Sequence, residues 1–216
     1  MVRAPKVYVS PSGSFGGLII SYQEVSMSIK FCDSETRVNL MRAFAGESQA
    51  RNRYVFSADF SKKEHLQVIE QVFRFTAAQE QQHAKIFYDH LQELNGNTIV
   101  IDAGYPVDNY KDVNKLLRAA QHNEYEEHDD IYSHFGEVAA SEGFDAVADS
   151  FQRIAKIEKI HGDRFGRLAQ LLEDKKLFVS DVESAWMCLK CGHVYQGNEA
   201  PKVCPVCRHD QGYFIR

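Results

Sequence analysis

Residues 69–94 read IEQVFRFTAAQEQQHAKIFYDHLQEL, and this stretch decides the fold. Its apolar residues recur at spacings of three and four, which is the period of one face of an α-helix. That face carries Ile69, Phe73, Thr76, Glu80, His83, Phe87, Leu91 and Leu94. Glu80 and His83 therefore interrupt the centre of a row that otherwise forms core. An acid and an imidazole in that position point to chemistry inside a helical protein.

Three further stretches carry a row of this kind, here called a buried stripe. The stripes are Leu40, Phe44, Glu47, Arg51 and Val55; Val113, Leu117, Ala120, Glu124, Glu127, Ile131, Phe135 and Val138; and Val147, Phe151, Ile154, Glu158, His161, Phe165, Leu168 and Leu172. A single Glu on an apolar stripe usually means that the phase of the helix was misjudged and that the carboxylate faces solvent. A single Glu-x-x-His pair often occurs by chance. Their coincidence at the centre of four stripes favours one shared site.

The signals for helix ends predict four long helices. We expect them at 33–59, 63–94, 111–141 and 144–172. Asp33 and Ser34 are good N-cap residues, Asn95-Gly96 is a strong stop, and Gly143 marks the last junction. Two tight connections then flank one long extended connection over 98–109. This plan predicts a mainly α protein with a ferritin-like four-helix bundle.

The positions of the ionisable residues support that plan independently. Antiparallel helices joined by a short turn bring together residues that are equidistant from the turn. Glu47 and the Glu80/His83 pair are centred near residue 64, where the first turn is predicted. The Glu124/Glu127 and Glu158/His161 pairs are centred on Gly143. Each hairpin should therefore bring its acids and imidazoles to one level of the bundle.

A metal ion is the simplest reason to bury five glutamates together. An isolated buried carboxylate costs several kcal/mol or becomes protonated, so a cluster of them needs a compensating cation. Five carboxylates and two imidazoles suit iron or manganese with bridging carboxylates, and no cysteine interrupts the stripes. The excess negative charge favours the oxidised metal pair.

The last 36 residues change character and contain four cysteines. Cys188-x-x-Cys191 and Cys204-x-x-Cys207 form a strong four-thiolate signal for a tetrahedral metal. The spacing fits zinc and iron equally, and structural zinc ribbons are common. Wrapping by Trp186, Tyr195, Tyr213 and Phe214, together with the attached redox bundle, favours iron. Cys32 lies outside this set and is interpreted as an ordinary thiol.

Composition limits the partners and the compartment. The net charge is -5 and 25% of the residues are charged, so nucleic acid and anionic membranes are not expected as partners. No apolar run approaches the roughly 18 residues of a membrane helix. Clustered rather than dispersed cysteines favour a reducing compartment, and a secretory signal is not evident, so we expect a cytoplasmic protein.

We therefore expect three regions along the chain. Residues 1–30 are predicted to be a poorly structured N-terminal extension, with Met27 as an alternative start. Residues 31–178 should form the bundle, and residues 181–216 should form a small metal-binding domain, here called the four-cysteine module.

The motifs together resemble those of rubrerythrins. The resemblance rests on Phe44-Ala-Gly-Glu-Ser-Gln-Ala-Arg-Asn-Arg-Tyr54, Glu80-Gln-Gln-His83, Glu124-Tyr-Glu-Glu127, Ile131-Tyr132, Glu158-Lys-Ile-His161 and the stretch from Cys188 to Cys207. It runs from about residue 33 to the C-terminus in the domain order of the family, with a rubredoxin-like domain at the end.

The resemblance implies a peroxidase that reduces hydrogen peroxide to water in oxidative-stress defence. Electrons would pass from a reduced pyridine nucleotide, through rubredoxin or its reductase, to the rubredoxin-like iron and on to a di-iron pair. The implied di-iron ligands are Glu47, Glu80, His83, Glu124, Glu127, Glu158 and His161, and the single iron would be held by Cys188, Cys191, Cys204 and Cys207. By the same resemblance Glu127 and His83 exchange at one iron, Tyr54 and Tyr132 line the site, and the protein forms a head-to-tail homodimer.

Two other readings of the residues stay open. A di-iron oxidase or ferroxidase would use the same carboxylate and imidazole set. An iron-storage bundle would combine it with a structural zinc ribbon, and storage requires assembly into a shell. For the two tyrosines, ordinary core packing with a satisfied hydroxyl is the alternative.

Overall fold

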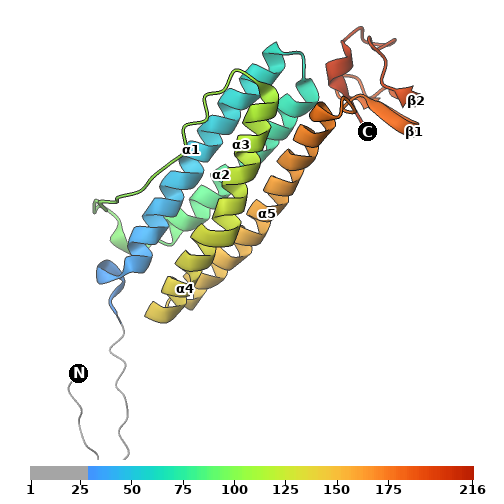
Figure 1. The fold of residues 1–216 in the computed structure, drawn as a ribbon. Helices are drawn as coiled ribbons and strands as arrows, with labels where there is room; N and C mark the ends of the chain where they lie inside the picture. Colours follow the sequence, from blue (N-terminus) through green and yellow to red (C-terminus); the bar gives the residue numbers. More distant parts are fainter. Residues whose placement is uncertain (1–28) are drawn as a thin grey trace, which may run out of the picture.

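The computed structural model describes residues 29–216, and α-helices dominate it (Figure 1). The helices are α1 (Glu35–Lys63), α2 (Gln67–Asp89), α3 (Val113–Glu126), α4 (Tyr132–Glu142) and α5 (Asp145–Glu173), with the π-helical segment η3 (Glu127–Ile131) between α3 and α4. The strands are β1 (Val179–Cys188), β2 (Val194–Glu199) and β3 (Phe214–Ile215). Within the described part of the chain, no helix has the length and apolarity to span a membrane. The prediction for residues 1–30 falls, except for its last two residues, outside the described residues.

The predicted ferritin-like four-helix bundle is confirmed. Helices α1 and α2 form one hairpin, and α3, η3 and α4 together form a rod that pairs with α5 (Figure 1). The first turn contains His65 in the left-handed region, with φ 57°. The second contains Gly143 with φ 89°, a conformation that costs glycine little. Residues 95–112, the crossover, link the hairpins and run along α1, where the hydroxyl of Tyr105 donates to the carbonyl of Arg42 over 2.9 Å.

Two helix boundaries differ from the prediction. Helix α1 continues to Lys63 instead of ending at 59, and the hydroxyls of Ser57 and Ser61 donate to carbonyls four residues earlier. Helix α2 starts at Gln67 and ends at Asp89 rather than spanning 63–94. Beyond it the chain tightens into a 3-10 turn at Gln92–Leu94, so the row of apolar side chains continues although the α-helix has ended.

The predicted continuous helix 111–141 is wrong in its middle. It starts at Val113, where the side chain of Asp112 caps it, and it is interrupted by the π-helical turn η3 before α4. A π-turn accommodates one residue more than an α-helical turn and shifts the phase of the residues after it. Side chains of α4 that an unbroken helix would direct toward solvent therefore face the bundle.

Two apolar clusters fill the bundle, one on each side of the ionisable residues. On α5, Phe151 belongs to one cluster and Phe165 to the other, while Glu158 and His161 lie between them. The same arrangement holds along α1, along α2 and along the rod of α3, η3 and α4. The charged groups are therefore enclosed between two apolar layers that exclude water.

The four-cysteine module is a small sheet around a compact core of its own. Its strand order is β2-β1-β3, with β1 antiparallel to both neighbours. Trp186 and Phe214 are fully buried with two of the cysteines, and Tyr213 packs against them. Tyr195 is 40% exposed on the edge strand β2, so the prediction that it wraps the metal site is wrong. An edge strand with one face in solvent leaves that ring outside the core.

The four-cysteine module packs against the end of the bundle that carries the α1–α2 turn (Figure 1). Asp210 lies 3.0 Å from the ring nitrogen Nδ1 of His65, and Ile215 packs against the nearer apolar cluster. The packing is tight at Gly212. A Cβ atom at this position would lie 1.9 Å from the backbone oxygen of His65. Only a residue without a side chain fits there.

Replacing Gly212 by alanine should therefore force the module away from the bundle. We expect the free energy of unfolding to fall by about 1–3 kcal/mol, because the clash involves backbone on both sides. Urea denaturation followed by the fluorescence of Trp186, the single tryptophan, would measure it. Gly136→Ala is the matched control, since its Cβ would make ordinary contacts at 3.5 Å, and it should be neutral or stabilising by up to about 1 kcal/mol. Equal stability of Gly212→Ala and the parent would contradict the observed packing.

Candidate metal centres

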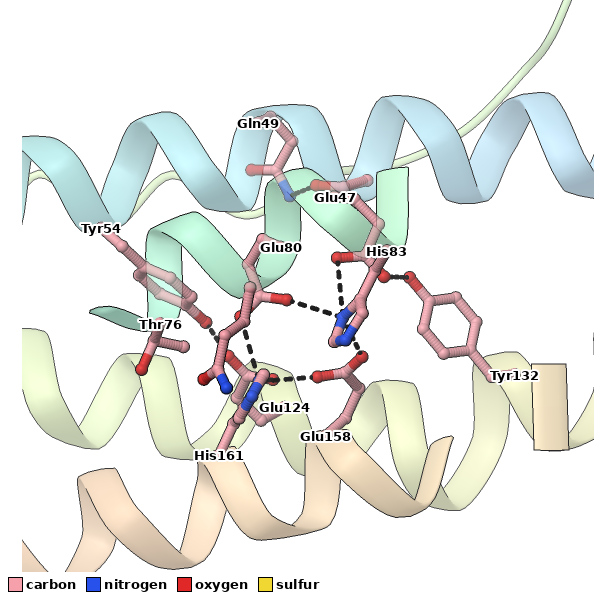
Figure 2. Close-up of polar contacts among 12 residues, drawn as sticks. Glu47, Gln49, Tyr54, Thr76, Glu80, His83, Glu124, Tyr132, Glu158 and His161 are labelled. Atoms are coloured by element: carbon pink, nitrogen blue, oxygen red, sulfur yellow. Dashed lines mark hydrogen bonds and ion pairs between the residues drawn. The ribbon is translucent and has the colours of Figure 1, made fainter. Parts of the chain in front are cut away.

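Six of the seven predicted ligands in the bundle form two overlapping groups (Figure 2). One group is Glu47, Glu80, His83 and Glu158, and the other is Glu80, Glu124, Glu158 and His161. Within each group the ligand atoms lie within 4.8 Å of one another. We call these six residues the ionisable layer. Because Glu80 and Glu158 belong to both groups, each could offer a ligand atom to either of two metal ions.

The helices place these residues by their period and by their pairing. On α2 and on α5, a glutamate and a histidine three positions apart project from the same face. The two imidazole rings lie nearly parallel, with centroids 5.6 Å apart. The Nδ1 atom of His83 lies 2.9 Å from Glu158 and 3.0 Å from Glu80, and that of His161 lies 2.8 Å and 3.0 Å from the same two residues. The layer is therefore close to two-fold symmetric.

The carboxylates of the layer strongly perturb one another's pKa values. Burial, followed by the charge of Glu158, raises the pKa of Glu47 well above its usual range. Burial and the charge of Glu80 do the same to the pKa of Glu124. For Glu80 burial acts in the same direction, but polar contacts with both imidazoles outweigh it and lower its pKa to about 2. Like charges at this density require either protons or metal ions between them.

The imidazoles show the complementary effect. Burial lowers the pKa of His83, but its contacts with Glu158 and Glu80 outweigh burial and raise it to about 9. For His161 burial is likewise outweighed, by contacts with Glu124, Glu158 and Glu80, and its pKa rises to about 12. In the absence of metal, both rings therefore hold the protons that the carboxylates need as counter-charge. A metal ion would take the place of these protons.

Unpaired polar atoms show that the layer fits metal ions. Seven buried atoms of these side chains have no hydrogen-bonding partner of acceptable geometry among the described residues: Oε2 of Glu47, Oε1 of Glu80, Oε2 of Glu124, both oxygens of Glu158 and both ring nitrogens of His161. Buried polar groups are normally paired. Carboxylate oxygens and imidazole nitrogens are donors that iron and manganese accept, and neither of the two groups contains a thiolate.

Two tyrosines hold the carboxylates from outside. The hydroxyl of Tyr132 donates to Oε1 of Glu47 over 2.6 Å, and the hydroxyl of Tyr54 donates to Oε1 of Glu124 (Figure 2). Both rings are almost fully buried. Burial raises the pKa of each well above its usual range, and the charges of Glu127 beside Tyr132 and of Glu124 beside Tyr54 raise it further. Both hydroxyls therefore stay protonated and act as donors.

Removing the hydroxyl of Tyr132 should weaken metal binding. In Tyr132→Phe the Glu47 carboxylate loses the donor that orients it, and we expect about tenfold weaker iron binding in a competition with a chelator. Tyr88→Phe is the matched control, because Tyr88 is 55% exposed and its ring stacks on Phe44 rather than on a residue of the layer. Unchanged iron affinity in Tyr132→Phe would show that this tyrosine only packs in the core.

Glu127, the seventh predicted ligand, lies outside both groups. It begins the π-helical turn η3, and it is only partly buried, whereas the residues of the layer are buried. Burial, the charge of Glu124 and then that of Glu158 raise its pKa well above the usual range, so it lies close to the layer. It is the predicted residue that faces both the layer and the surface.

A sequence signal for the π-turn exists in the spacing of the motifs. Tyr54 follows Glu47 by seven positions, whereas Tyr132 follows Glu124 by eight. Glu80 follows Glu47 by 33 positions, and Glu158 follows Glu124 by 34. The second half of the bundle thus carries one extra residue, and the wider π-turn accommodates it.

A polar cluster that the sequence patterns do not reveal fixes the crossover. Asp108 accepts from Arg53 over 2.7 Å and from Asn123 over 2.8 Å, and the side chains of Asp108 and Arg53 are mostly buried. Arg53 also donates to Gln49 and lies over the ring of Tyr54. Nothing local in the sequence marks Asp108 as the partner, because 55 positions separate it from Arg53.

The four predicted cysteines are brought together in the four-cysteine module. Their sulfur atoms form one group within 4.8 Å, with 3.7 Å between Cys188 and Cys207 and 3.7 Å between Cys191 and Cys204. Burial raises the pKa of Cys204, but hydrogen bonds from the backbone N–H groups of Cys207 and Val206 outweigh it and lower the pKa to about 6. Thiolates in a turn with such donors suit a rubredoxin-like metal site.

Comparisons with known proteins agree with both centres. A family model described as Rubrerythrin matches residues 38–169, and one described as Rubrerythrin, rubredoxin-like domain, matches residues 186–215. Rubrerythrin-1 of Clostridium acetobutylicum is 45% identical over 84% of this chain and 93% of its own. The rubrerythrin of Porphyromonas gingivalis is 44% identical over 88% and 93%, and that of Nitratidesulfovibrio vulgaris is 35% identical over 84% and 93%.

Solved structures support the fold. A nigerythrin in a mixed-valence state superimposes with a TM-score of 0.57 at 24% identity, over 88% of this chain and 90% of the other. A Desulfovibrio desulfuricans bacterioferritin with a di-iron site gives 0.59 at 20% identity, over 66% and 82%. The donor sets and the relatives together assign iron as the cofactor: a di-iron pair in the bundle and a rubredoxin-like site in the four-cysteine module, where the four thiolates also fit zinc.

Proposed function

Because this chain belongs to the rubrerythrin family of oxidoreductases, we propose that it is a di-iron peroxidase that reduces hydrogen peroxide to water. The proposal rests on the ionisable layer, in which seven buried polar atoms have no hydrogen-bonding partner among the described residues and could bind metal. The same chain also carries the four-cysteine module. We place the activity in the cytoplasm, as a defence against oxidative stress, because the four clustered thiolates need a reducing compartment.

The residues of the layer would bind the iron pair and keep it away from bulk water. Glu80 and Glu158 would bridge, with Glu47 and His83 on one side and Glu124 and His161 on the other. When bound, the iron pair supplies the two electrons for O–O cleavage and acts as a Lewis acid toward the departing hydroxide. Tyr54 and Tyr132 would keep Glu124 and Glu47 in orientation through their hydroxyl groups.

We further propose that Glu127 and His83 alternate as ligands of one iron when its oxidation state changes. Glu127 starts a π-turn, an element that often occurs at functional sites, and lies just outside the layer. A carboxylate favours the more highly charged ferric ion. Crystal structures of the oxidised and reduced forms would test this, and a fixed His83 ligand in both would contradict it.

The four-cysteine module would deliver electrons one at a time, from a reduced pyridine nucleotide through rubredoxin or its reductase. A head-to-tail homodimer would bring the module of one chain near the di-iron pair of its partner. Sedimentation of the iron-loaded protein tests the assembly: a dimer agrees with the proposal, and a large shell favours iron storage.

One experiment distinguishes the proposed peroxidase from its alternatives. The protein is loaded with iron without oxygen, its metal content is measured, and the visible spectrum is examined for the ferric four-thiolate centre. Turnover with hydrogen peroxide and with dioxygen is then compared. Three irons per chain and a preference for peroxide support the proposal. Preferential dioxygen consumption favours an oxidase or ferroxidase, and zinc in the four-cysteine module would remove the internal electron carrier.

A further inference from the structure

A cavity of about 570 Å³ lies beside the ionisable layer. It lies between α1, the crossover and the segment from η3 to α4. Its lining includes Glu127 and Tyr132, and the hydroxyl of Tyr132 donates to Glu47 of the layer. The cavity is therefore one residue away from the candidate di-iron pair, on the side where Glu127 lies.

The cavity is much larger than hydrogen peroxide requires. One water molecule, which is only slightly smaller than hydrogen peroxide, occupies about 30 Å³ in the liquid. Cavities of about 300–1,000 Å³ instead bind small organic molecules. The walls include Ala43 and Phe135 and the rings of Tyr105 and Pro106, so much of the lining is apolar. This apolar lining could contact a hydrocarbon group, which hydrogen peroxide lacks.

Gly46 determines how much room is left beside the layer. A Cβ atom there would lie 3.7 Å from Cε1 of Tyr105, which is ordinary contact, so alanine would fit and a larger side chain would extend into the cavity. The opposite wall is fixed in place. Tyr105 donates to the carbonyl of Arg42, and Arg42 donates to the carbonyl of Asp102 over 3.1 Å. The cavity is thus preformed.

Its charges favour a neutral ligand. Two arginines line it, but Arg42 is paired with Glu35 at 2.5 Å and Arg53 with Asp108 at 2.7 Å. The carboxyl groups of Glu126, Glu127 and Asp130 also line it. A ligand with its own carboxylate would meet the like charges of Glu126 and Asp130, and both arginines of the described lining are already neutralised.

We propose that this cavity admits small neutral alkyl hydroperoxides as a second class of substrate, with the alkyl group beside Gly46 and Tyr105 and the hydroperoxide group toward Glu127. The inference rests on the proposed peroxidase function. The net step joins ROOH, two electrons and two protons to give ROH and water. The O–O bond breaks, and the electrons come from the reduced iron that hydrogen peroxide reduction already requires.

The first test measures binding without turnover. Cumyl alcohol, the product expected from cumene hydroperoxide, is titrated into the metal-free protein and followed by NMR. We expect saturable binding, with shifts at residues 43–46 and 102–106. Gly46→Leu should weaken binding about tenfold or more, because the side chain fills the cavity. Gly136→Ala, whose added Cβ on α4 makes only ordinary contacts with α5, should bind like the parent.

The second test measures selectivity in the iron-loaded full chain. We expect cumene hydroperoxide to be reduced to cumyl alcohol, since one-electron cleavage would give acetophenone instead. Gly46→Leu should lower kcat/KM for cumene hydroperoxide about tenfold more than for hydrogen peroxide. Tyr105→Ala, which widens the cavity, should shift selectivity the other way. A hydroperoxy fatty acid should be a poorer substrate than cumene hydroperoxide.

The outcomes separate this proposal from the proposed function. Turnover of hydrogen peroxide without turnover of cumene hydroperoxide would overturn the alkyl hydroperoxide proposal alone. Turnover of neither would overturn both. Turnover of both with equal effects of Gly46→Leu and no effect of Tyr105→Ala would also overturn it, because the cavity would not select the alkyl group. Absence of cumyl alcohol binding to the metal-free parent would count against it independently of any activity.

Discussion

Cys188→Ala should abolish the steady-state reduction of hydrogen peroxide by donor electrons, while the reduced protein still becomes oxidised once by stoichiometric peroxide. Cys188 is fully buried, and its sulfur completes the group of four. Without it the module cannot hold the four-thiolate iron that, in the proposed function, would carry single electrons, whereas the ionisable layer lies in a different part of the chain. We expect the steady-state rate to fall by about 100-fold or more, and stopped-flow oxidation of the reduced bundle to persist.

The fifth cysteine provides the matched control. Cys32 is exposed just before α1, outside the four-cysteine module, so Cys32→Ala should keep the steady-state rate of the parent. Far-UV circular dichroism would verify that the helices of both variants are intact. If Cys188→Ala turned over at the parental rate, the four-cysteine module would have no role as an electron relay.

Removing the iron pair should reverse the way in which stability depends on pH. In the metal-free bundle the pKa values of His83 and His161 are about 9 and about 12, above the value of about 6.5 expected in the unfolded chain. Their contribution to stability is complete below pH 6.5 and falls as the pH rises, until it is lost above about 9 for His83 and above about 12 for His161. The raised pKa values of Glu47 and Glu124 act with the same sign. The lowered pKa of Glu80 acts oppositely, but only as the pH falls from about 4.5 toward 2.

Iron changes the sign because it replaces the protons. Bound metal requires ionised carboxylates and neutral imidazoles, so protons compete with it and the iron-loaded protein should lose stability on acidification. We expect the Tm of the metal-free protein, measured by circular dichroism, to fall by about 10 °C between pH 6.5 and 9. The Tm of the iron-loaded protein should stay level over that range.

Two histidine variants locate the effect. His83→Gln should reduce the pH dependence of the metal-free protein, since it removes one of the two proton-holding rings. His122→Gln should leave it unchanged, because His122 is an exposed residue that pairs with Glu126 at the surface. The same pH dependence in the metal-free and iron-loaded forms would show that the ionisable layer does not exchange protons for metal.

Much of this architecture could be predicted because the information is local in the chain. Spacings of three and four put Glu80 with His83, and Glu158 with His161, on the buried faces of their helices. Burial of five acids in a bundle requires a cation wherever the helices lie, so the apolar residues around them already indicate a metal site. The paired cysteines specify their own turns. These features depend on helix period and turn geometry, which a few neighbouring residues determine.

The boundaries and the phase of the helices were predicted less well. The sequence pattern predicts an unbroken α-helix where η3 intervenes, because a π-turn has no composition of its own and Glu127–Ile131 contains neither glycine nor proline. The extra residue in the second half of the bundle was visible, but only the packing against α5 shows where it is accommodated. This placement determines that Tyr132 reaches Glu47 and that Glu127 lies outside the layer.

By itself, then, the sequence determined the bundle, its central layer of acids and imidazoles, and the four-cysteine module, because each is specified by residues close together in the chain. Only the tertiary structure decided the cavity beside that layer and the position of the module. The cavity beside Gly46 exists because Asp108 and Tyr105 hold the crossover against α1, and the module fits against the α1–α2 turn because Gly212 meets the backbone of His65. Such contacts join residues that are distant in sequence, so no local pattern encodes them.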